Sequence, residues 1–423
     1  MWEKMKNKTG IILGCFVLEL LLLFYFRNET GFILSPLLFL FAGFGLVYFS
    51  SQQDINLSQN QHSPAAELTH LRNRTFIFIT LIGIFYSGYL FHKWPIQIEN
   101  SDIIPLIQQI YVDRFIHMQA VYDLYTGFNY GTFTPNYLPF HWFPFVLPEL
   151  LHLDPRWAFV LVYLIASYLY VFKFVKASTK QNLIIQILLP FLLWFSIMVK
   201  QGKDYANTVE LLIAAYYMIL CLSLFSNKPF LKAAALILLI LSRYSLVFWL
   251  PVYFFSLWLT NRNLSYKTAL YLVGMILVFY VPFLIQSPHM LNSGSQLWID
   301  AALGEWKGQS WQAPGDKPFQ LFQGMGFASW IYTWAYGSLQ EKILFTKNLM
   351  LIMSLLSLMG SIIWIWMKRN SGQLSLLALF ALKISLLIFY SFVFVPYVYL
   401  FWVTIIPSIL IVSIHLQSKT QEF

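Results

Sequence analysis

Apolar runs of about membrane-spanning length recur along the whole sequence, and they constrain the fold more than any other feature. A helix needs about 20 apolar residues to cross the hydrocarbon core of a bilayer. Ten runs approach this length, at 11–26, 32–49, 75–92, 156–175, 183–199, 205–226, 268–285, 343–366, 374–395 and 398–415. An eleventh run, from Pro229 to Thr260, is too long for one ordinary crossing, and it carries the polar stretch SRYS near its middle. We divide it into two short helices, so the sequence predicts a transmembrane bundle of about twelve helices.

Composition places the chain in the same class. Hydrophobic residues make up 58% and charged residues 11% of the sequence, against a usual charged share of about 25% in soluble domains. We therefore expect a single all-α, polytopic membrane domain over residues 1–423. The basic start followed by an apolar stretch is typical of a signal peptide, but no small-residue cleavage site follows, which favours a retained first helix.

The net charge of +9 is distributed unevenly over the predicted loops. With the N-terminus inside, the inner ends hold 15 Lys and Arg against 4 Asp and Glu, whereas the outer ends hold 11 against 12. Basic residues concentrate on the cytoplasmic side of short membrane loops. The positive charge therefore indicates topology, and it leaves little reason to expect a nucleic-acid partner.

Two predicted outer loops are long, at about 93–155 and 286–341. Loops of this length without a fold of their own are uncommon and often functional. The first contains an apolar stripe at helical spacing, which predicts an amphipathic helix on the membrane surface; its members are Ile104, Ile107, Tyr111, Phe115 and Met118. The second loop is rich in Trp and has the same interfacial character. We expect amphipathic helices in both.

Several enzyme signatures are missing from the sequence. It contains no GxxxxGK[ST], no GxGxxG after a strand, no HExxH, no CxxC pair and no DxD, each of which marks a particular phosphate or metal site. His117, His141 and His152 have no metal-ligand spacing. The sequence therefore predicts no metal and no bound cofactor, and it disfavours an ATPase or a metal-dependent nucleotide-sugar enzyme.

Two stretches resemble a known superfamily. The outer stretch SDIIPLIQQIYVDRFIHMQAVYDLY, followed by FTPNYLPFHWFPFVLPELLHLDPRWAF, resembles the first large outer loop of polyprenyl-phosphate-sugar glycosyltransferases, and LLILSRYSLVFWLP resembles their paired short helices. The chain is similar to the GT-C superfamily, nearest to glycosyltransferase family 87 and related mannosyltransferases. The specific likeness covers about a quarter of the chain.

The resemblance implies a catalytic role for Asp102, whose match in the superfamily is an Asp that follows an outward-going helix and acts as general base. Tyr122, Tyr137 and Pro139 match the Tyr and Y-x-P positions that follow. The chain departs from the pattern because the acid usually follows the first helix, whereas Asp102 follows the third. An extra N-terminal hairpin over residues 10–49 is therefore assumed; otherwise Glu29 takes the place of Asp102.

The chemistry of such a transfer names further candidates. A carboxylate must take the proton of the acceptor hydroxyl, and cations must stabilise charge on the departing phosphate. Asp113 is the second catalytic candidate, and Glu99, one helical turn before Asp102, is placed to bind the acceptor or to raise the proton affinity of Asp102. Cations inside membrane segments are costly and usually functional, which makes Arg243 and Lys383 substrate-binding candidates. Tyr122 and Tyr137 complete the predicted substrate site.

Each candidate also has a purely structural interpretation. Asp102 is suited to cap a helix that opens at Ile103, and Asp113 stands beside Arg114 as in a solvated surface pair. Arg243 has the length to reach the interface from within the membrane, and the same argument applies to Lys383.

The sequence therefore favours a hexosyltransferase in the inner or plasma membrane. It would move a sugar, with mannose the family-weighted choice, from a polyprenyl-phosphate donor to a glycan, lipid or protein acceptor on the extracytoplasmic face. The alternative is a polytopic transporter or lipid flippase, and a noncatalytic assembly protein is a third possibility. Transporters often show an internal repeat and charged sites at mid-membrane, and this sequence shows no visible repeat and few such charges.

Overall fold

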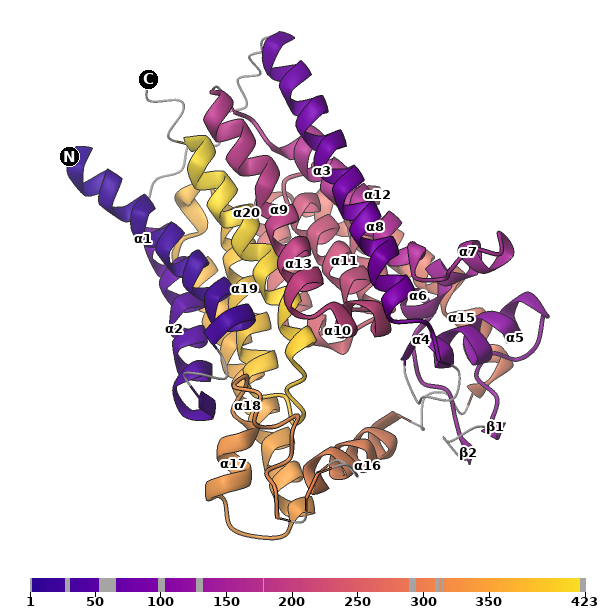
Figure 1. Cartoon of the computed structure of the whole chain (residues 1–423). Coiled ribbons are helices and arrows are strands. Elements are labelled where there is room, and N and C mark those ends of the chain that lie inside the picture. Colours follow the sequence, from indigo (N-terminus) through magenta and orange to yellow (C-terminus); the bar gives the residue numbers. More distant parts are fainter. Residues whose placement is uncertain are drawn as a thin grey trace.

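The computed structural model describes residues 2–26, 31–52, 66–97, 103–126, 132–177, 179–288, 294–308, 312–313 and 315–418. Helices dominate this part of the chain, and its strands are two residues long. The helices pack side by side into a bundle, with the start of α1 and the end of α20 at the same end of it (Figure 1). The prediction of an all-α membrane bundle is confirmed at this level.

Eight helical stretches in the described part of the chain are long and apolar enough to cross a membrane. They are α1 (Trp2–Leu21) with η1 (Leu22–Phe26), α2 (Gly31–Ser51), α3 (Ala66–Lys93), α8 (Trp157–Leu169) with η5 (Tyr170–Phe174), α9 (Lys180–Lys200), α18 (Leu339–Met367), α19 (Leu374–Ser391), and η9 (Val398–Phe401) with α20 (Trp402–Ser418). All eight coincide with predicted crossings, so the chain is an integral membrane protein.

Four further helices occupy the remaining predicted crossings. They are α11 (Glu210–Ser223), α12 (Pro229–Ile240), α13 (Leu250–Thr260) and α14 (Arg262–Phe279). The long run at 229–260 is divided as expected, because α12 ends and α13 begins on either side of a break that contains the short helix η6 (Tyr244–Leu246). These four helices fall short of the length or hydropathy of the other eight, so the count of twelve crossings stays a prediction.

Burial separates central from peripheral helices. The apolar windows of α19 and α20 are 83% and 94% buried inside the protein, whereas those of α3 and α18 are 28% and 22% buried. A helix that is hydrophobic all round is suited to either position. The contacts therefore place α19 and α20 in the core and leave most of α3 and α18 to face lipid.

The two segments predicted as outer loops contain most of the short elements. The first holds α4 (Ile103–Leu106), η2 (Ile107–Val112), α5 (Asp113–Ile116), β1 (Tyr125–Thr126), β2 (Thr132–Phe133), α6 (Pro139–Trp142), η4 (Phe143–Phe145) and α7 (Val146–Leu150). The second holds α16 (Gly294–Lys307) and α17 (Ala328–Trp334), and the short helix α15 (Val281–Gln286) leads into it. The strands pair antiparallel, with Tyr125 opposite Phe133. Both segments lie toward the end of the bundle away from the labelled termini, where α10 (Gly202–Asn207) also lies (Figure 1). The 3-10 turn η8 (Arg369–Ser371) joins α18 to α19.

The apolar stripe of the first segment faces the protein over most of its length. Ile104, Ile107 and Tyr111 are at most 1% exposed and belong to the main hydrophobic core. Met118 lies beyond the end of α5 with a positive φ of 55° and is 89% exposed. The helical spacing is therefore correct up to Phe115, but the stripe covers the bundle instead of resting on a membrane surface.

The buried side chain of Arg156 connects the two ends of the first outer segment. Arg156 donates to the carbonyl oxygens of Trp94 at 2.5 Å and Phe91 at 3.0 Å, which end α3, and its Nη2 lies 2.6 Å from Asp154 Oδ2. Carbonyls at a helix C-terminus lack partners within the helix, so one guanidinium satisfies them and joins the end of α3 to the start of α8.

Candidate functional site

The break between α12 and α13 brings a cation to a carboxylate. Arg243 has an extended backbone there, and its Nη2 forms an ion pair with Oε1 of Glu210, the first residue of α11. The Arg243 side chain is 20% exposed and that of Glu210 is 1% exposed. The N-terminal turn of a helix favours a negative charge, so α11 helps to hold the carboxylate in this position.

The pair is only partly satisfied by its surroundings. Beyond the ion pair itself, neither Glu210 oxygen has a hydrogen-bond partner among the described residues, and the same holds for Nε of Arg243. Buried polar atoms normally find such partners in the protein or in ordered water. The arrangement therefore leaves hydrogen-bonding capacity for a polar ligand or for water.

A hydroxyl network fixes the break that carries Arg243. Ser245, two residues further on, lies 2.8 Å from the hydroxyl oxygen of Tyr217 and accepts from Tyr390 at 3.1 Å. These tyrosines belong to α11 and α19. The break that carries Arg243 is thus held by both α11 and α19, of which α19 is distant in the sequence.

The segment around α6 forms the next part of the site. The Phe140 amide donates to the Leu241 carbonyl at 2.8 Å, which ties α6 to the break. His141 is 2% exposed and stacks on Tyr137 with ring centroids 4.3 Å apart. Burial, and then the charge of Arg243, hold the pKa of His141 well below its usual value, and an interaction with the Ser242 backbone offsets this only in part. The imidazole is therefore neutral at neutral pH.

Tyr122 and Tyr137, both predicted to bind substrate, have different environments. The Tyr122 hydroxyl donates to the Tyr137 carbonyl at 2.8 Å and accepts from Trp142 Nε1 at 3.0 Å. Burial raises the pKa of Tyr122 far above its usual value. Tyr122 thus holds the backbone of Tyr137, while the half-buried Tyr137 ring lies 6.4 Å from the Trp298 ring of α16.

The second outer segment approaches the site at several points. Besides Trp298, Ser287 donates to Asp123 at 2.8 Å, and Tyr397 donates to Glu305 of α16 at 2.9 Å. Burial and the Glu305 carboxylate raise the pKa of Tyr397 well above its usual value. Helix α16 therefore reaches from Tyr137 of the first segment to the loop before α20.

Asp113 lies at the surface of the first segment. Its side chain is 57% exposed, and its Oδ1 is 3.2 Å from Nδ1 of His117. Arg114 instead donates to the carbonyls of Val121, Asp123 and Leu124. Asp113 and Arg114 therefore make separate contacts in place of the surface pair considered from the sequence.

Glu99 and Asp102 lie outside the described residues, so their positions relative to Arg243 stay predictions. Helix α4 begins at Ile103, directly after Asp102. The catalytic and the helix-capping interpretations of Asp102 both remain open.

Lys383 has a partner in the middle of the bundle. Its ammonium group forms an ion pair with Glu19 of α1 and donates to the Thr404 carbonyl at 2.8 Å, and both charged side chains are 0% exposed. It lies seven residues before Tyr390 on α19, which corresponds to about 10 Å along the helix axis. These contacts explain Lys383 without a substrate, and they separate it from the group around Arg243.

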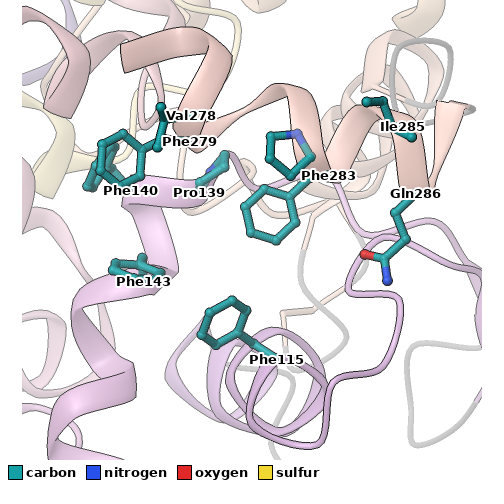
Figure 2. Close-up of a pocket in the computed structure, with 10 residues that line it drawn as sticks. Phe115, Pro139, Phe140, Phe143, Val278, Phe279, Phe283, Ile285 and Gln286 are labelled. Atoms are coloured by element: carbon teal, nitrogen blue, oxygen red, sulfur yellow. The ribbon is translucent and has the colours of Figure 1, made fainter. Parts of the chain in front are cut away.

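An apolar groove of about 540 Å³ is lined in part by α6 (Figure 2). Its walls come from α5, from α6 and η4, and from the ends of α14 and α15. The lining residues are Phe115, Pro139, Phe140, Phe143, Val278, Phe279, Pro282, Phe283, Ile285 and Gln286. Val278 and Ile285 are 65% and 75% exposed, so the groove opens on the outer surface of the bundle.

The chain matches no family model, no curated protein and no solved structure. Within the described residues, no three His, Cys, Asp or Glu side chains gather in a group that could hold a metal ion.

Sequence reasoning missed Glu210 and His141 as members of the site. Glu210 opens an apolar run, and an ionisable residue beside such a run is itself a signal of function. His141 has no signal of its own, because its position depends on the Phe140–Leu241 hydrogen bond, which joins segments about a hundred residues apart.

Proposed function

We propose that this protein is a membrane glycosyltransferase of the GT-C type that uses a polyprenyl-phosphate sugar as donor. The observation that carries the proposal is the partly exposed, incompletely bonded Arg243 at a break that is hydrogen-bonded to α6, a wall of an apolar groove. In the segment around α6, Pro139, Phe140 and Phe143 line the groove, and the pKa of His141 is lowered by the charge of Arg243. A lipid with an anionic head and a long apolar chain fits this combination.

The groove is the proposed seat of the polyprenyl chain near its phosphate. Its volume lies within the range of about 300 to 1,000 Å³ that is common for ligand pockets. Aromatic rings dominate the lining, and Gln286 is its one polar side chain. Because lining residues face outward from a membrane-embedded bundle, a chain would reach the groove from the bilayer.

Arg243 is the proposed phosphate contact. A guanidinium offers a planar fork of donors that matches phosphate geometry. In the reaction the acceptor oxygen attacks the anomeric carbon, the bond from that carbon to the phosphate oxygen breaks, and the acceptor proton passes to a carboxylate. The lipid phosphate departs with the electron pair, and Arg243 stabilises its charge.

Asp102 is the proposed proton acceptor and Asp113 the second candidate, with Glu99 beside the acceptor. We place Tyr137 next to the transferred sugar, because its ring is half-buried and stands between His141 and Trp298. Mannose as the sugar and the extracytoplasmic face of an inner or plasma membrane as the location belong to the same proposal.

Transfer of a labelled sugar by the purified protein tests the proposal. The protein would be offered polyprenyl-phosphate mannose and polyprenyl-phosphate glucose with hydroxyl acceptors, and both glycosylated product and released polyprenyl phosphate would be scored. Loss of a general base typically costs 10² to 10⁴ fold, so we expect about that loss in Asp102→Asn. Asp113→Asn, compared at equal amounts of folded protein, is the matched variant. Near-normal transfer by Asp102→Asn with collapse of Asp113→Asn would move the catalytic role to Asp113.

A transporter or lipid flippase is the second candidate, and the Glu19–Lys383 pair is the observation that favours it. Ionisable groups inside a membrane often mark an ion or substrate path. Reconstituted protein that moves a fluorescent polyprenyl phosphate between leaflets while making no glycosylated product, and that loses this movement in Lys383→Met compared at equal amounts of folded protein, would replace the transferase proposal.

A further inference from the structure

The Glu210 carboxylate is paired with the guanidinium of Arg243, the group that contacts the phosphate in the proposed function. We infer that Glu210 is an internal anion that the phosphate group of a ligand must displace from Arg243. This inference rests on the proposed phosphate role of Arg243, and it adds a residue that limits the affinity of the site.

Geometry favours displacement over simultaneous binding. Glu210 already contacts Nη2 of Arg243, and forked recognition of a phosphate uses the same edge groups of a guanidinium. Two anions on one cation repel each other, and the only ion pair that Glu210 forms among the described residues is with Arg243. A bound phosphate would therefore weaken the Glu210 contact.

The exposure of the two side chains indicates that Glu210 is bound to Arg243 first and that the phosphate comes from outside. Glu210 is 1% exposed at the start of α11, whereas Arg243 keeps 20% of its side chain accessible. Nε of Arg243 has no hydrogen-bond partner in the described chain. An incoming phosphate therefore meets the Arg243 side chain before it meets Glu210.

His141 supplies an independent sign of a polar ligand. It is 2% exposed, and apart from its interaction with the Ser242 backbone neither ring nitrogen has a well-formed hydrogen bond to the described residues. The charge of Arg243 lowers the pKa of His141, so the ring lies within electrostatic range of the same cation. A ligand oxygen at Arg243 would also give this buried ring a partner, which neither Glu210 oxygen provides.

Binding of undecaprenyl phosphate to the purified full-length protein in detergent tests the inference. Removing the competing charge in Glu210→Gln should raise the affinity about tenfold, while Arg243→Ala should lower it about tenfold. The double variant should bind as weakly as Arg243→Ala, because the competition acts only through the guanidinium. Undecaprenol, which has the chain without the phosphate, is the matched probe and should bind all four proteins alike.

Weaker binding by Glu210→Gln, or no change, would overturn the inference, since Glu210 would then be holding Arg243 in its working position. If Glu210→Gln does not fold, Glu210→Asp replaces it; the shortened carboxylate should give a smaller gain, and an unchanged affinity would be decisive against competition. Inorganic phosphate separates the two sources of the same chemistry. A gain for both probes supports displacement by any phosphate group, a gain for the lipid alone supports displacement by a lipid headgroup, and a gain for neither overturns it.

The outcome is distinguishable from failure of the proposed function. If Glu210→Gln binds phosphate more tightly but no sugar is transferred under any condition, the displacement stands and the glycosyltransferase proposal falls. If undecaprenyl phosphate binds no better than undecaprenol in every variant, Arg243 is not a phosphate site and the inference falls with it.

Discussion

Two ion pairs inside the same bundle differ in how completely they are satisfied. Glu19 and Lys383 are both 0% exposed; Lys383 also donates to the Thr404 carbonyl at 2.8 Å, and Ser408 donates to Glu19 Oε2 at 2.7 Å. In the Glu210–Arg243 pair, by contrast, neither the Glu210 carboxylate nor Nε of Arg243 has a further hydrogen bond among the described residues. The Arg243 side chain is also 20% exposed. One pair is complete and closed, and the other is incomplete and open.

The difference distinguishes a structural pair from the pair to which we propose that a ligand binds. Burying two charges is costly, and their attraction offsets that cost only when geometry is good and further hydrogen bonds are made. The Glu19–Lys383 pair meets this condition, and Gly43 of α2 covers it so closely that an added Cβ would overlap both Glu19 and Leu387. The Glu210–Arg243 pair does not meet it without a ligand or water.

The largest expected effect is on stability, from Lys383→Met. This change leaves the Glu19 carboxylate buried without its partner, which typically costs about 3 to 5 kcal/mol. Unfolding by a denaturing detergent, followed by circular dichroism, measures the loss. Adding Glu19→Leu should recover most of it, because removing both charges from a buried pair is often neutral. A stable single variant would show that water reaches the pair, contrary to a closed structural role.

Arg243→Ala should differ from Lys383→Met, because it should have a large effect on donor use and a smaller effect on stability. Loss of a charge-assisted phosphate contact should raise the donor KM or Kd by about ten- to a hundredfold. The stability loss should be smaller than that of Lys383→Met, because the exposed side of the site admits water to Glu210. Arg243→Lys keeps the charge but not the fork, so it should fall in between. An unchanged donor affinity in Arg243→Ala would remove its proposed role.

A change in the wall of the apolar groove should have a smaller effect on the affinity for the lipid phosphate. Phe143→Ala removes one aromatic wall, and burial of a large apolar side chain is worth about 1.5 to 3 kcal/mol. Since Phe143 is already 36% exposed, we expect about a fivefold loss of affinity for undecaprenyl phosphate and none for inorganic phosphate. The matched control is Phe85→Ala, which removes an 80% exposed ring of α3 outside this groove. Equal losses in both variants would show a general membrane effect.

Much of the fold follows from the sequence, because apolar run length is a local property. Each of the eight long helices lies over a predicted run, and the polar stretch around Arg243 correctly marks the division between α12 and α13. Which face a helix turns inward depends instead on its neighbours. The stripe that includes Ile104 and Ile107 shows this, since its spacing is helical but the bundle, not lipid, covers it.

The site was less accessible to sequence reasoning for the same physical reason. Arg243 stands out because a cation within an apolar run is costly, and so does Lys383. The sequence could not say that Lys383 would form a closed pair with Glu19 and Arg243 a partly open pair with Glu210. Both partners lie on other helices, and residue type alone does not show which helices pack together. The hydroxyl of Tyr122 likewise acts on the backbone of Tyr137, a contact that residue type alone does not predict.

The smallest expected effect concerns pH and reports on the open pair alone. Burial and the charge of Arg243 lower the pKa of His141 in the folded protein, whereas the unfolded chain has the usual pKa of about 6.5. Below that value the unfolded state binds a proton that the folded state refuses, so the free energy of unfolding falls as the pH drops from about 6.5 toward the lowered pKa. The slope for one such group is at most about 1.4 kcal/mol per pH unit.

His141→Gln should remove this part of the acid destabilisation when unfolding is measured between about pH 7.5 and 5.5, and Arg243→Ala should reduce it, because the repelling charge is gone. Lys383→Met combined with Glu19→Leu should keep the slope of the wild type, since His141 is unchanged. An identical acid slope in His141→Gln and the wild type would contradict this prediction. It would mean that His141 takes up a proton as easily in the folded protein as in the unfolded chain, so that neither burial nor the charge of Arg243 lowers its pKa.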